Sequence, residues 1–458
     1  PVREHLRDPL RIAIAGRVKA GKSTLVNALV GQRVAPTAVE ECTKVVTWFS
    51  YGVPERAEVV LRDRSRRVVP LRDGKVPDAF GVPLPEIDYV HVYLSRDSVR
   101  HVTYIDTPGL ASVNEQYSDR TEELLGDRAS RQASRQADAL VFLLSSPARQ
   151  DEAEALEAFS ALFKGTHASP ATAVAVLSRA DQIGGDGNPL ETAAKLAERQ
   201  AEALRSVAST VVPMAGLLAQ TTEARELEER DAFALELLAR ADPLEREQLL
   251  FSHEELLRYD TPVPETQRRR LAALLDLFGI GRALELIDAG ADGAGALERE
   301  LRKISGIDRL RTLLDETFAQ RADALKANAA LEALSRISWQ AADAQSAPAL
   351  LELREAVEDL RLEPDMRVIA EIWAAQAAAA PETLLPESLQ ADIALLMRTS
   401  DPAGKVGLPP GASARQVQSA ARERIAQWRE YANLNAATEA EARIARIMYR
   451  SFEALAAG

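Results

Sequence analysis

The first 220 residues consist of short apolar runs separated by segments with the spacing of helices. Leu10–Ala15, Ala139–Leu144 and Thr172–Leu177 are almost wholly apolar, which is typical of strands buried on both faces of a sheet. Helical patterns over Asp119–Gln136 and Asp151–Phe163 stand before and after the second of these runs. This alternation predicts an α/β fold with a mostly parallel sheet flanked by helices, which binds ligands at the carboxyl ends of its strands.

Further strands are expected where β-branched and aromatic residues gather or alternate with polar ones. The runs with this pattern are Thr43–Tyr51, Ile87–Leu94, Val99–Ile105 and a hairpin of Ala57–Leu61 with Arg67–Leu71. A last short strand and its loop are expected at Val211–Gly216.

Helical spacing dominates beyond residue 220. Charged segments interrupted by proline predict a helical insertion at about 220–300, with separate helices over 264–278 and 280–289. Apolar stripes follow, and the last of them, within Ala412–Ala456, would be about 65 Å long as one continuous helix. Because such helices cannot bury their stripes alone, the pattern predicts an elongated helical bundle.

These patterns divide the chain into two expected units. An α/β domain covers 10–320 and contains the helical insertion, and a helical bundle covers 321–458, which residues 1–9 could join. The chain of 458 residues is long enough for two such units.

Composition and charge narrow the classes of function. The formal net charge of −13 argues against a general nucleic-acid-binding surface. Cys42 is the only cysteine, so a reducing compartment is expected. No run of about 18 apolar residues and no leader pattern is present, and the start at Pro1 is compatible with a trimmed end.

The loop between the first strand and the first helix carries the first chemical motif. Its sequence is Gly16-Arg17-Val18-Lys19-Ala20-Gly21-Lys22-Ser23, and Thr24 follows. This G-x-x-x-x-G-K-S pattern between a strand and a helix is typical of a phosphate-binding P-loop. Its backbone N–H groups would cradle phosphates, Lys22 would reach the β- and γ-phosphates, and Ser23 would bind Mg²⁺.

A second motif, Asp106-Thr107-Pro108-Gly109, ends a predicted strand. Asp106 would hold Mg²⁺, and the Gly109 N–H would bond the γ-phosphate. Thr43 is the candidate for a threonine that completes the Mg²⁺ shell and orients the attacking water, with Thr37 and Thr47 as rivals.

A third motif predicts which base is bound. Ser178-Arg179-Ala180-Asp181 follows a buried strand where guanine-nucleotide proteins carry N/T-K-x-D. Asp181 can accept hydrogen bonds from the N1–H and 2-amino groups of guanine, and the Arg179 side chain can cover the base. Ala215 and Gly216 stand where a final base-contacting loop belongs.

Taken together, these motifs resemble those of bacterial dynamin-like GTPases, most closely the actinobacterial isoniazid-induced type. Further likeness lies in Glu41-Cys42-Thr43, in Ser305–Leu310 and in Arg321–Lys326, so that it covers about the first 325 residues. The resemblance implies hydrolysis of GTP to GDP with Mg²⁺, homo- or heterodimerisation through GTPase domains, and remodelling of anionic membranes by a helical stalk. It also implies a cytoplasmic protein, at the inner face of the plasma membrane when membrane-bound.

One position of the P-loop departs from dynamins, which have serine where this chain has Lys19. Related guanylate-binding proteins place an arginine there, so Lys19 could supply positive charge to the transition state. On this hypothesis Lys19→Ala lowers turnover more than nucleotide affinity. Leu110, rather than a glutamine, follows Gly109, so the backbone would have to position water.

The stalk would need a tip to reach a membrane. Residues 399–412 are the least helical part of the bundle, and Lys405, Val406 and Leu408 offer one charge and two shallow apolar wedges there. Leu384 and Leu385 form a rival tip.

Two other functions fit the same motifs. One is a GTP-dependent switch whose helices dock a protein partner, such as another dynamin-like subunit, without touching lipid. The other is a ribosome-assembly GTPase, which the lack of a basic RNA-binding tail disfavours.

Overall fold

The computed structural model describes most of the chain. The described residues are 2–17, 19–35, 45–77, 80–108, 137–144, 171–183, 188–204, 208–339, 347–362, 367–379, 383–436 and 438–457. The helices predicted over 119–136 and 151–163 lie outside these ranges.

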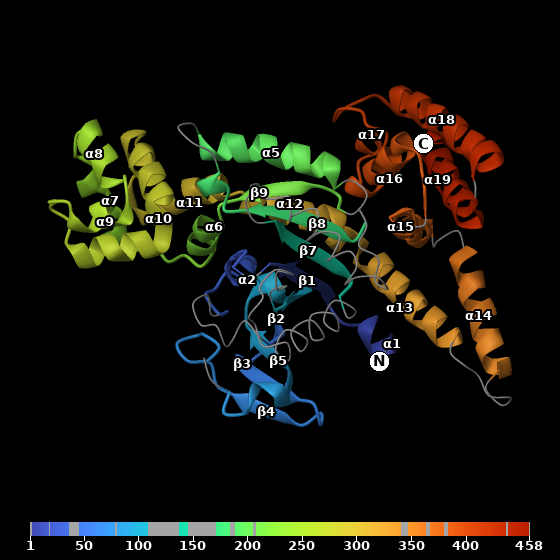
Figure 1. Ribbon diagram of the computed structural model, residues 1–458, viewed down its shortest axis with the longest axis horizontal. Helices are drawn as coiled ribbons and strands as arrows, with labels where there is room; N and C mark the ends of the chain where they lie inside the picture. The colour runs from blue at the N-terminus through green and yellow to red at the C-terminus, as the bar shows by residue number, and fades with distance from the viewer. Residues whose placement is uncertain are drawn as a thin grey trace, which may run out of the picture.

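A nine-stranded mixed sheet forms the centre of the described structure (Figure 1). Its order is β4-β3-β5-β2-β6-β1-β7-β8-β9, with parallel pairing from β6 through β9 and between β2 and β5. The predicted hairpin is confirmed as the antiparallel β3–β4 pair. The strands are β1 (Leu10–Gly16), β2 (Thr47–Tyr51), β3 (Arg56–Leu61), β4 (Arg66–Val69), β5 (Ile87–Leu94), β6 (Val102–Asp106), β7 (Ala139–Leu144), β8 (Ala173–Ser178) and β9 (Val211–Met214).

Alternate residues of β1 enter two different cores, as the period of a strand requires. Ile12 and Ile14 pack in the cluster that contains α2 (Lys22–Val30) and α12 (Ile307–Thr317), whereas Ala13 and Ala15 pack in the cluster that contains α5 (Pro189–Ala203). The sheet is therefore covered by helices on both faces. The helices of this part are α1 (Val2–His5), α2 (Lys22–Val30), α5 (Pro189–Ala203) and α6 (Gly216–Glu223), with 3₁₀ turns η2 (Leu84–Glu86), η3 (Asp97–Val99) and η4 (Ala180–Gln182).

A group of helices after α6 has a hydrophobic cluster of its own. We call α7–α11 the helical unit; it lies at one end of the long axis of the molecule (Figure 1). The two helices expected over 264–289 are present as the two parts of α10, which are divided by a break at Asp276, where φ is 56° and ψ is 179°. The members are α7 (Glu229–Ala239), α8 (Pro243–Leu249), α9 (His253–Arg258), α10 (Glu265–Asp288) and α11 (Gly293–Ser305).

The helix α12 lies beside the sheet, and the helices that follow it lie at the opposite end of the long axis (Figure 1). The stripe Leu310, Leu314 and Phe318 of α12 is buried in the same cluster as β1 and the C-terminal helices, so one core runs from the sheet into the bundle. Lys326 also donates to the carbonyls of Leu6 and Asp8. The helices are α12 (Ile307–Thr317), η5 (Ala319–Arg321), α13 (Ala322–Ser338), α14 (Ala347–Leu362), α15 (Arg367–Ala378), α16 (Glu387–Arg398), α17 (Pro402–Lys405), α18 (Ala414–Glu430), the π-helix η7 (Tyr431–Asn435) and α19 (Glu439–Ala457).

Residues 412–456 do not form the single continuous helix that would be about 65 Å long. The π-helix η7 separates α18 from α19, and the two helices lie side by side (Figure 1). Trp428 of α18 and Phe452 of α19 are fully buried in the same cluster. In one straight helix the apolar stripes of α18 and α19 could not pack against each other. Folding back brings the two stripes together and buries more apolar surface.

The expectation of an exposed tip at 399–412 is also wrong. Val406 is only 2% exposed and lies in the main core, and Leu408 packs against that core. Arg321 of η5 donates to the Met397 and Thr399 carbonyls, which ties the start of this segment to the end of α12. Of the rival pair, Leu384 is exposed and Leu385 is buried.

Gly306, between α11 and α12, is expected to be the most sensitive glycine of this junction. Its φ is +84°, and a Cβ there would lie 2.5 Å from the Pro213 carbonyl oxygen of β9. Gly306→Ala should lower the free energy of unfolding by about 3 kcal/mol, since a left-handed conformation and a backbone clash both oppose alanine. Urea unfolding measures this loss.

Gly290→Ala is the matched control, because Gly290 also has a positive φ of +95° but nothing lies within 4 Å of its Cβ position. It should lose only about 1 kcal/mol. Equal losses in the two variants would mean that the contact with β9 does not constrain residue 306.

No helix among the residues that the structure describes combines the length and apolar character needed to cross a membrane.

Candidate functional site

The P-loop wraps around the N-terminus of α2, directly after β1. Gly16 packs against β7, where a Cβ would lie 2.9 Å from the Leu143 carbonyl oxygen. Gly21 has a φ of +93°, and no atom of the described residues lies within 4 Å of its Cβ position. Backbone N–H groups at such a terminus form an anion-binding site.

Lys22 is buried at the first position of α2. Its ammonium donates to the carbonyls of Gly16 (3.2 Å) and Arg17 (2.9 Å). Burial lowers the pKa of Lys22, and the charge of Asp106 acts against that shift. A phosphate chain would supply the negative charge that this ammonium lacks.

Ser23 and Asp106 meet across the ends of α2 and β6. The Ser23 hydroxyl donates to Asp106 Oδ2 over 3.1 Å, whereas Asp106 Oδ1 is buried and has no hydrogen-bond partner among the described residues. The next residue, Thr107, bonds the Ile14 carbonyl through both its N–H and its hydroxyl, which holds the end of β6 beside β1.

These oxygens fit Mg²⁺. A hydroxyl and a carboxylate are hard donors of the kind that Mg²⁺ takes beside nucleotide phosphates. An unpartnered buried carboxylate oxygen costs free energy, and a cation there would remove that cost. The chain would thus hold Mg²⁺ through Ser23 and Asp106.

The pH dependence of Mg²⁺ binding follows from Asp106. Burial raises the pKa of this carboxyl to about 6, against the opposing effects of Lys22 and the Ser23 hydrogen bond. Only the carboxylate binds Mg²⁺, so affinity should fall about tenfold between pH 8 and pH 5, measured by Mg²⁺ titration with GDP present. Asp106→Asn, which lacks the carboxylate, should bind Mg²⁺ weakly at both pH values and show no such dependence. An affinity in the unmodified chain that is flat down to pH 5 would contradict the assignment.

The raised pKa of Asp106 makes the free energy of unfolding fall with rising pH, whereas it makes the expected Mg²⁺ affinity rise. A carboxyl whose pKa is higher in the folded than in the unfolded state makes the folded state bind more protons between about pH 4 and pH 6. The Asp106 contribution to stability is therefore present at low pH and is lost as the pH rises through that window.

The Ser178–Asp181 motif, which is predicted to recognise the base, starts at the end of β8 and lies against the P-loop. Ser178 donates to the Leu144 carbonyl (2.9 Å), and Arg179, with a left-handed φ of 55°, donates to the Lys19 carbonyl (2.8 Å). Asp181 follows on η4, where burial raises its pKa and the charge of Asp276 raises it further. The structure therefore brings the P-loop and the third motif together. Asp276, at the break in α10, lies close enough to Asp181 for its charge to act on that carboxyl.

Ala215 does not offer a group to a nucleotide in this arrangement. It is 1% exposed, and its N–H donates to the Ser305 carbonyl over 3.0 Å. Gly216, the first residue of α6, lies beside Thr24, with 3.6 Å between its Cβ position and Thr24 Cγ2. The expected contact of Ala215 with the base is therefore corrected: its N–H is used by the Ser305 carbonyl. This hydrogen bond joins the end of β9 to the chain just before α12.

Several predicted site residues lie outside the described residues, namely Val18, Thr37, Thr43 and Gly109. The rival Thr47 is in β2, opposite Asp106 in the register of β6, and its hydroxyl donates to the Val45 carbonyl.

Sequence reasoning missed two buried polar residues behind the site. Asn27 is fully buried in α2, and its nearest side-chain partner is Gln220 of α6 (3.1 Å). A polar residue inside the otherwise apolar run Leu25–Val30 was a signal that could have found the first of them.

Comparison with known proteins shows similarity in both the sheet domain and the C-terminal helices. Residues 12–164 match the model of the Dynamin family. The isoniazid-induced protein IniC of Mycobacterium tuberculosis is 32% identical over 470 aligned residues, which cover 99% of this chain and 91% of IniC. The isoniazid-induced protein IniA of that organism is 32% identical over 135 residues, 27% of this chain and 21% of IniA. A solved structure from work on an oligomerised bacterial dynamin pair aligns with 100% of this chain and 71% of its own, at a TM-score of 0.36 and 14% identity.

Proposed function

The chain belongs to the dynamin family of GTPases, and from this premise we propose that it hydrolyses GTP to GDP with Mg²⁺ and uses this cycle to bind and reshape membranes. One observation carries the chemical half of the proposal. Lys22, Ser23 and Asp106 Oδ1, which has no hydrogen-bond partner within the described part of the chain, meet at the N-terminus of α2. A polyphosphate with a divalent cation complements these groups.

Each residue of the site has a distinct part in the proposed reaction. Lys22 neutralises charge on the β- and γ-phosphates, and the N–H groups around Gly21 orient them. Bound Mg²⁺ would stabilise negative charge that builds up on the phosphate oxygens. Thr43 and Gly109 are proposed to position water and to sense the γ-phosphate. Release of phosphate from GTP, with and without EDTA, tests this half.

Lys19 is proposed to add positive charge during hydrolysis. It is exposed at the rim of the P-loop, and its carbonyl is held by Arg179. Its side chain is therefore on the open side of the phosphate site rather than in the core.

The far end of the α13–α14 pair replaces residues 399–412 as the proposed lipid contact. Trp339 ends α13 and is 68% exposed, with the Arg354 guanidinium 3.6 Å from its ring centroid. Ile337 and Leu351 are also exposed, and this end of the pair points away from the sheet (Figure 1). Tryptophan beside arginine suits the interface of an anionic membrane.

Sedimentation with anionic liposomes, with and without a non-hydrolysable GTP analogue, tests the membrane half. The unmodified chain should pellet only with lipid, and Trp339→Ser should reduce the pelleted fraction at least about fivefold because it removes the interfacial anchor. Leu384→Ser is the matched control, since Leu384 is 79% exposed but belongs to the rival tip. A loss with Leu384→Ser alone would move the contact to that residue.

The second candidate is a GTP-dependent switch that docks a protein partner, such as another dynamin-like subunit. Phe233, Leu244 and Phe251 are exposed on the helical unit, and the net charge of −13 disfavours anionic lipid. If the protein hydrolyses GTP but stays in solution with every liposome preparation, this candidate stands and the membrane half fails. Nucleotide-dependent dimerisation, proposed in both cases, is measured by sedimentation velocity.

A further inference from the structure

Asn27 ties the C-terminal half of the P-loop helix to the residues that follow it. Its Oδ1 accepts from the N–H groups of Val34 (3.0 Å) and Ala35 (2.8 Å), and its Nδ2 donates to the Ala35 carbonyl (3.0 Å). The second Nδ2 hydrogen points at Gln220 Oε1 on α6, 3.1 Å away. Because its oxygen is fully used, the Asn27 side chain can only donate to Gln220.

The Gln220 amide has hydrogen-bond donors at both of its ends. Asn27 Nδ2 faces one end, and the Nε and Nη2 atoms of Arg33 lie 2.8 and 3.1 Å from the other. An amide has only one oxygen, so Gln220 can accept from Asn27 or from Arg33 but not from both. The side chain is 1% exposed, and a rotation of the amide by 180° exchanges the two partners.

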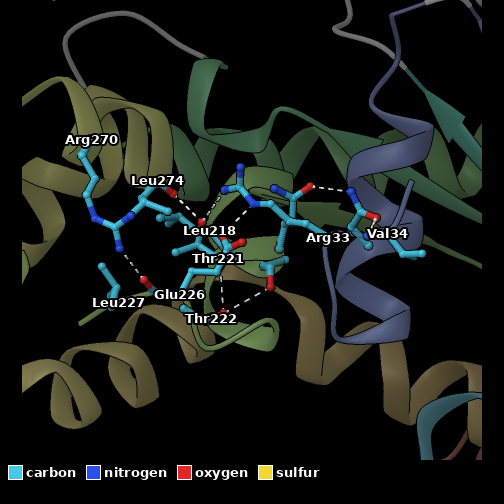
Figure 2. A network of polar contacts seen from close by, with 12 residues as sticks. Arg33, Val34, Leu218, Thr221, Thr222, Glu226, Leu227, Arg270 and Leu274 are labelled. Carbon is cyan, nitrogen blue, oxygen red and sulfur yellow. Dashed lines mark hydrogen bonds and ion pairs between the residues drawn. The ribbon is translucent and has the colours of Figure 1, made fainter. Parts of the chain in front are cut away.

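Thr221, the next residue of α6, reaches the break in α10 (Figure 2). Its hydroxyl donates to the Leu274 carbonyl over 2.6 Å and accepts from Arg33 Nη2. Inside a regular helix the Leu274 carbonyl would accept from the backbone four residues on, but the non-helical Asp276 interrupts that ladder. The break therefore leaves a carbonyl that α6 uses.

Arg33 also joins the helical unit by a second route. Its Nε pairs with Glu226 Oε2 over 2.6 Å, and Arg270 of α10 donates to the Glu226 carbonyl over 3.0 Å (Figure 2). When its oxygen faces Arg33, Gln220 is hydrogen-bonded to the contacts that lead to the helical unit. When its oxygen faces Asn27, it is hydrogen-bonded to the P-loop helix α2 instead.

We propose that Gln220 and Thr221 are positioning residues that couple nucleotide binding at α2 to the conformation of α10, with the Gln220 amide as the two-position element. Lys22 and Ser23 at one end of α2 hold the nucleotide, and Asn27, little more than one turn further along the helix, carries the link to α6. The helical unit thereby acts on the nucleotide site from a distance. This inference rests on the nucleotide binding proposed above, and it states which side chains transmit the effect.

A matched pair of valine variants in the full chain tests the link. Thr221→Val removes the bond to the Leu274 carbonyl, whereas Thr222→Val removes only bonds within α6, to Leu218 and Ala219, at a position that is also buried. Two properties are measured: the dissociation rate of fluorescent GDP, and amide hydrogen exchange of 265–288 with and without GDP.

GDP should slow exchange in α10 of the unmodified chain. In Thr221→Val that effect of GDP should disappear, and GDP should dissociate about fivefold faster, as expected for a coupling at the low end of the usual range. Thr222→Val should retain both properties within about twofold. The KM for GTP should change more than kcat, because the link acts on nucleotide binding.

Gln220→Glu is the second variant, and it keeps the test decisive if Thr221→Val folds poorly. A carboxylate can accept from Asn27 and Arg33 at the same time, so exchange in α10 should no longer respond to GDP although GDP still binds. The inference is overturned if GDP binds without changing exchange in α10 of the unmodified chain, or if Thr222→Val behaves like Thr221→Val. Failure of the unmodified chain to bind GDP would instead overturn the proposed function, and this inference with it.

Discussion

Lys22→Ala is expected to weaken binding of GTP and GDP by at least about 100-fold, because two charge-assisted hydrogen bonds to phosphate are lost. The ammonium is buried, and its two hydrogen-bond acceptors are the neutral carbonyls of Gly16 and Arg17. Burial lowers the pKa of Lys22, and a phosphate anion beside the ammonium would act against that shift. Titration calorimetry with Mg²⁺ and a non-hydrolysable GTP analogue measures the loss.

Lys19→Ala is the matched control for this prediction. Lys19 is the other lysine of the loop, but its side chain is exposed. Its removal should change affinity by less than about threefold and lower turnover more than that. Affinity in Lys22→Ala that stays within threefold of the unmodified chain would exclude this loop as the phosphate site, and equal loss of affinity and turnover in Lys19→Ala would exclude a catalytic part for Lys19.

Asp181→Asn is expected to change the base preference from guanine to xanthine, with the ratio of the two affinities shifting at least about 100-fold. The carboxylate can accept from the N1–H and 2-amino groups of guanine, whereas an asparagine amide can donate to the 2-oxo group of xanthine. Ser178 and Arg179 hold the loop through the Leu144 and Lys19 carbonyls, so the exchange should not displace it. Competition between GDP and XDP for the site measures the ratio.

Asp276→Asn provides the control, because Asp276 is the neighbouring carboxylate whose charge raises the pKa of Asp181. Its neutralisation should leave the preference for guanine intact. If Asp181→Asn also leaves the preference intact, the base is read by other groups.

The burial of the predicted tip shows that the apolar pattern of the sequence did not determine which residues of the bundle are exposed. Lys405, Val406 and Leu408 stand in a segment rich in glycine and proline, which suggested an exposed connection. Two contacts between distant segments place this segment. Arg321 binds the carbonyl of Met397, which lies 76 residues further along the chain, and the main core encloses Val406. Trp339 carried no such signal, because an aromatic residue at the end of a helix is equally typical of a core.

The sequence by itself determined the P-loop, the Asp106 motif, the Asp181 motif, the mostly parallel sheet and the helical character of the second half. Each of these depends on contacts within a few residues or on a short period of apolar positions, and both are written in the order of the residues. The roles of Thr43 and Gly109 remain predictions.

Only the tertiary structure decided which faces meet. The return of α19 onto α18, the burial of Ala215 behind α12 and the pairing of Asn27 with Gln220, 193 residues apart, follow from packing between distant segments. The sequence shows that residue 220 is a glutamine, but it does not show whether the amide faces solvent or two competing hydrogen-bond donors. Burial makes that difference, since a buried polar group must find its partners among whatever side chains the fold brings to it.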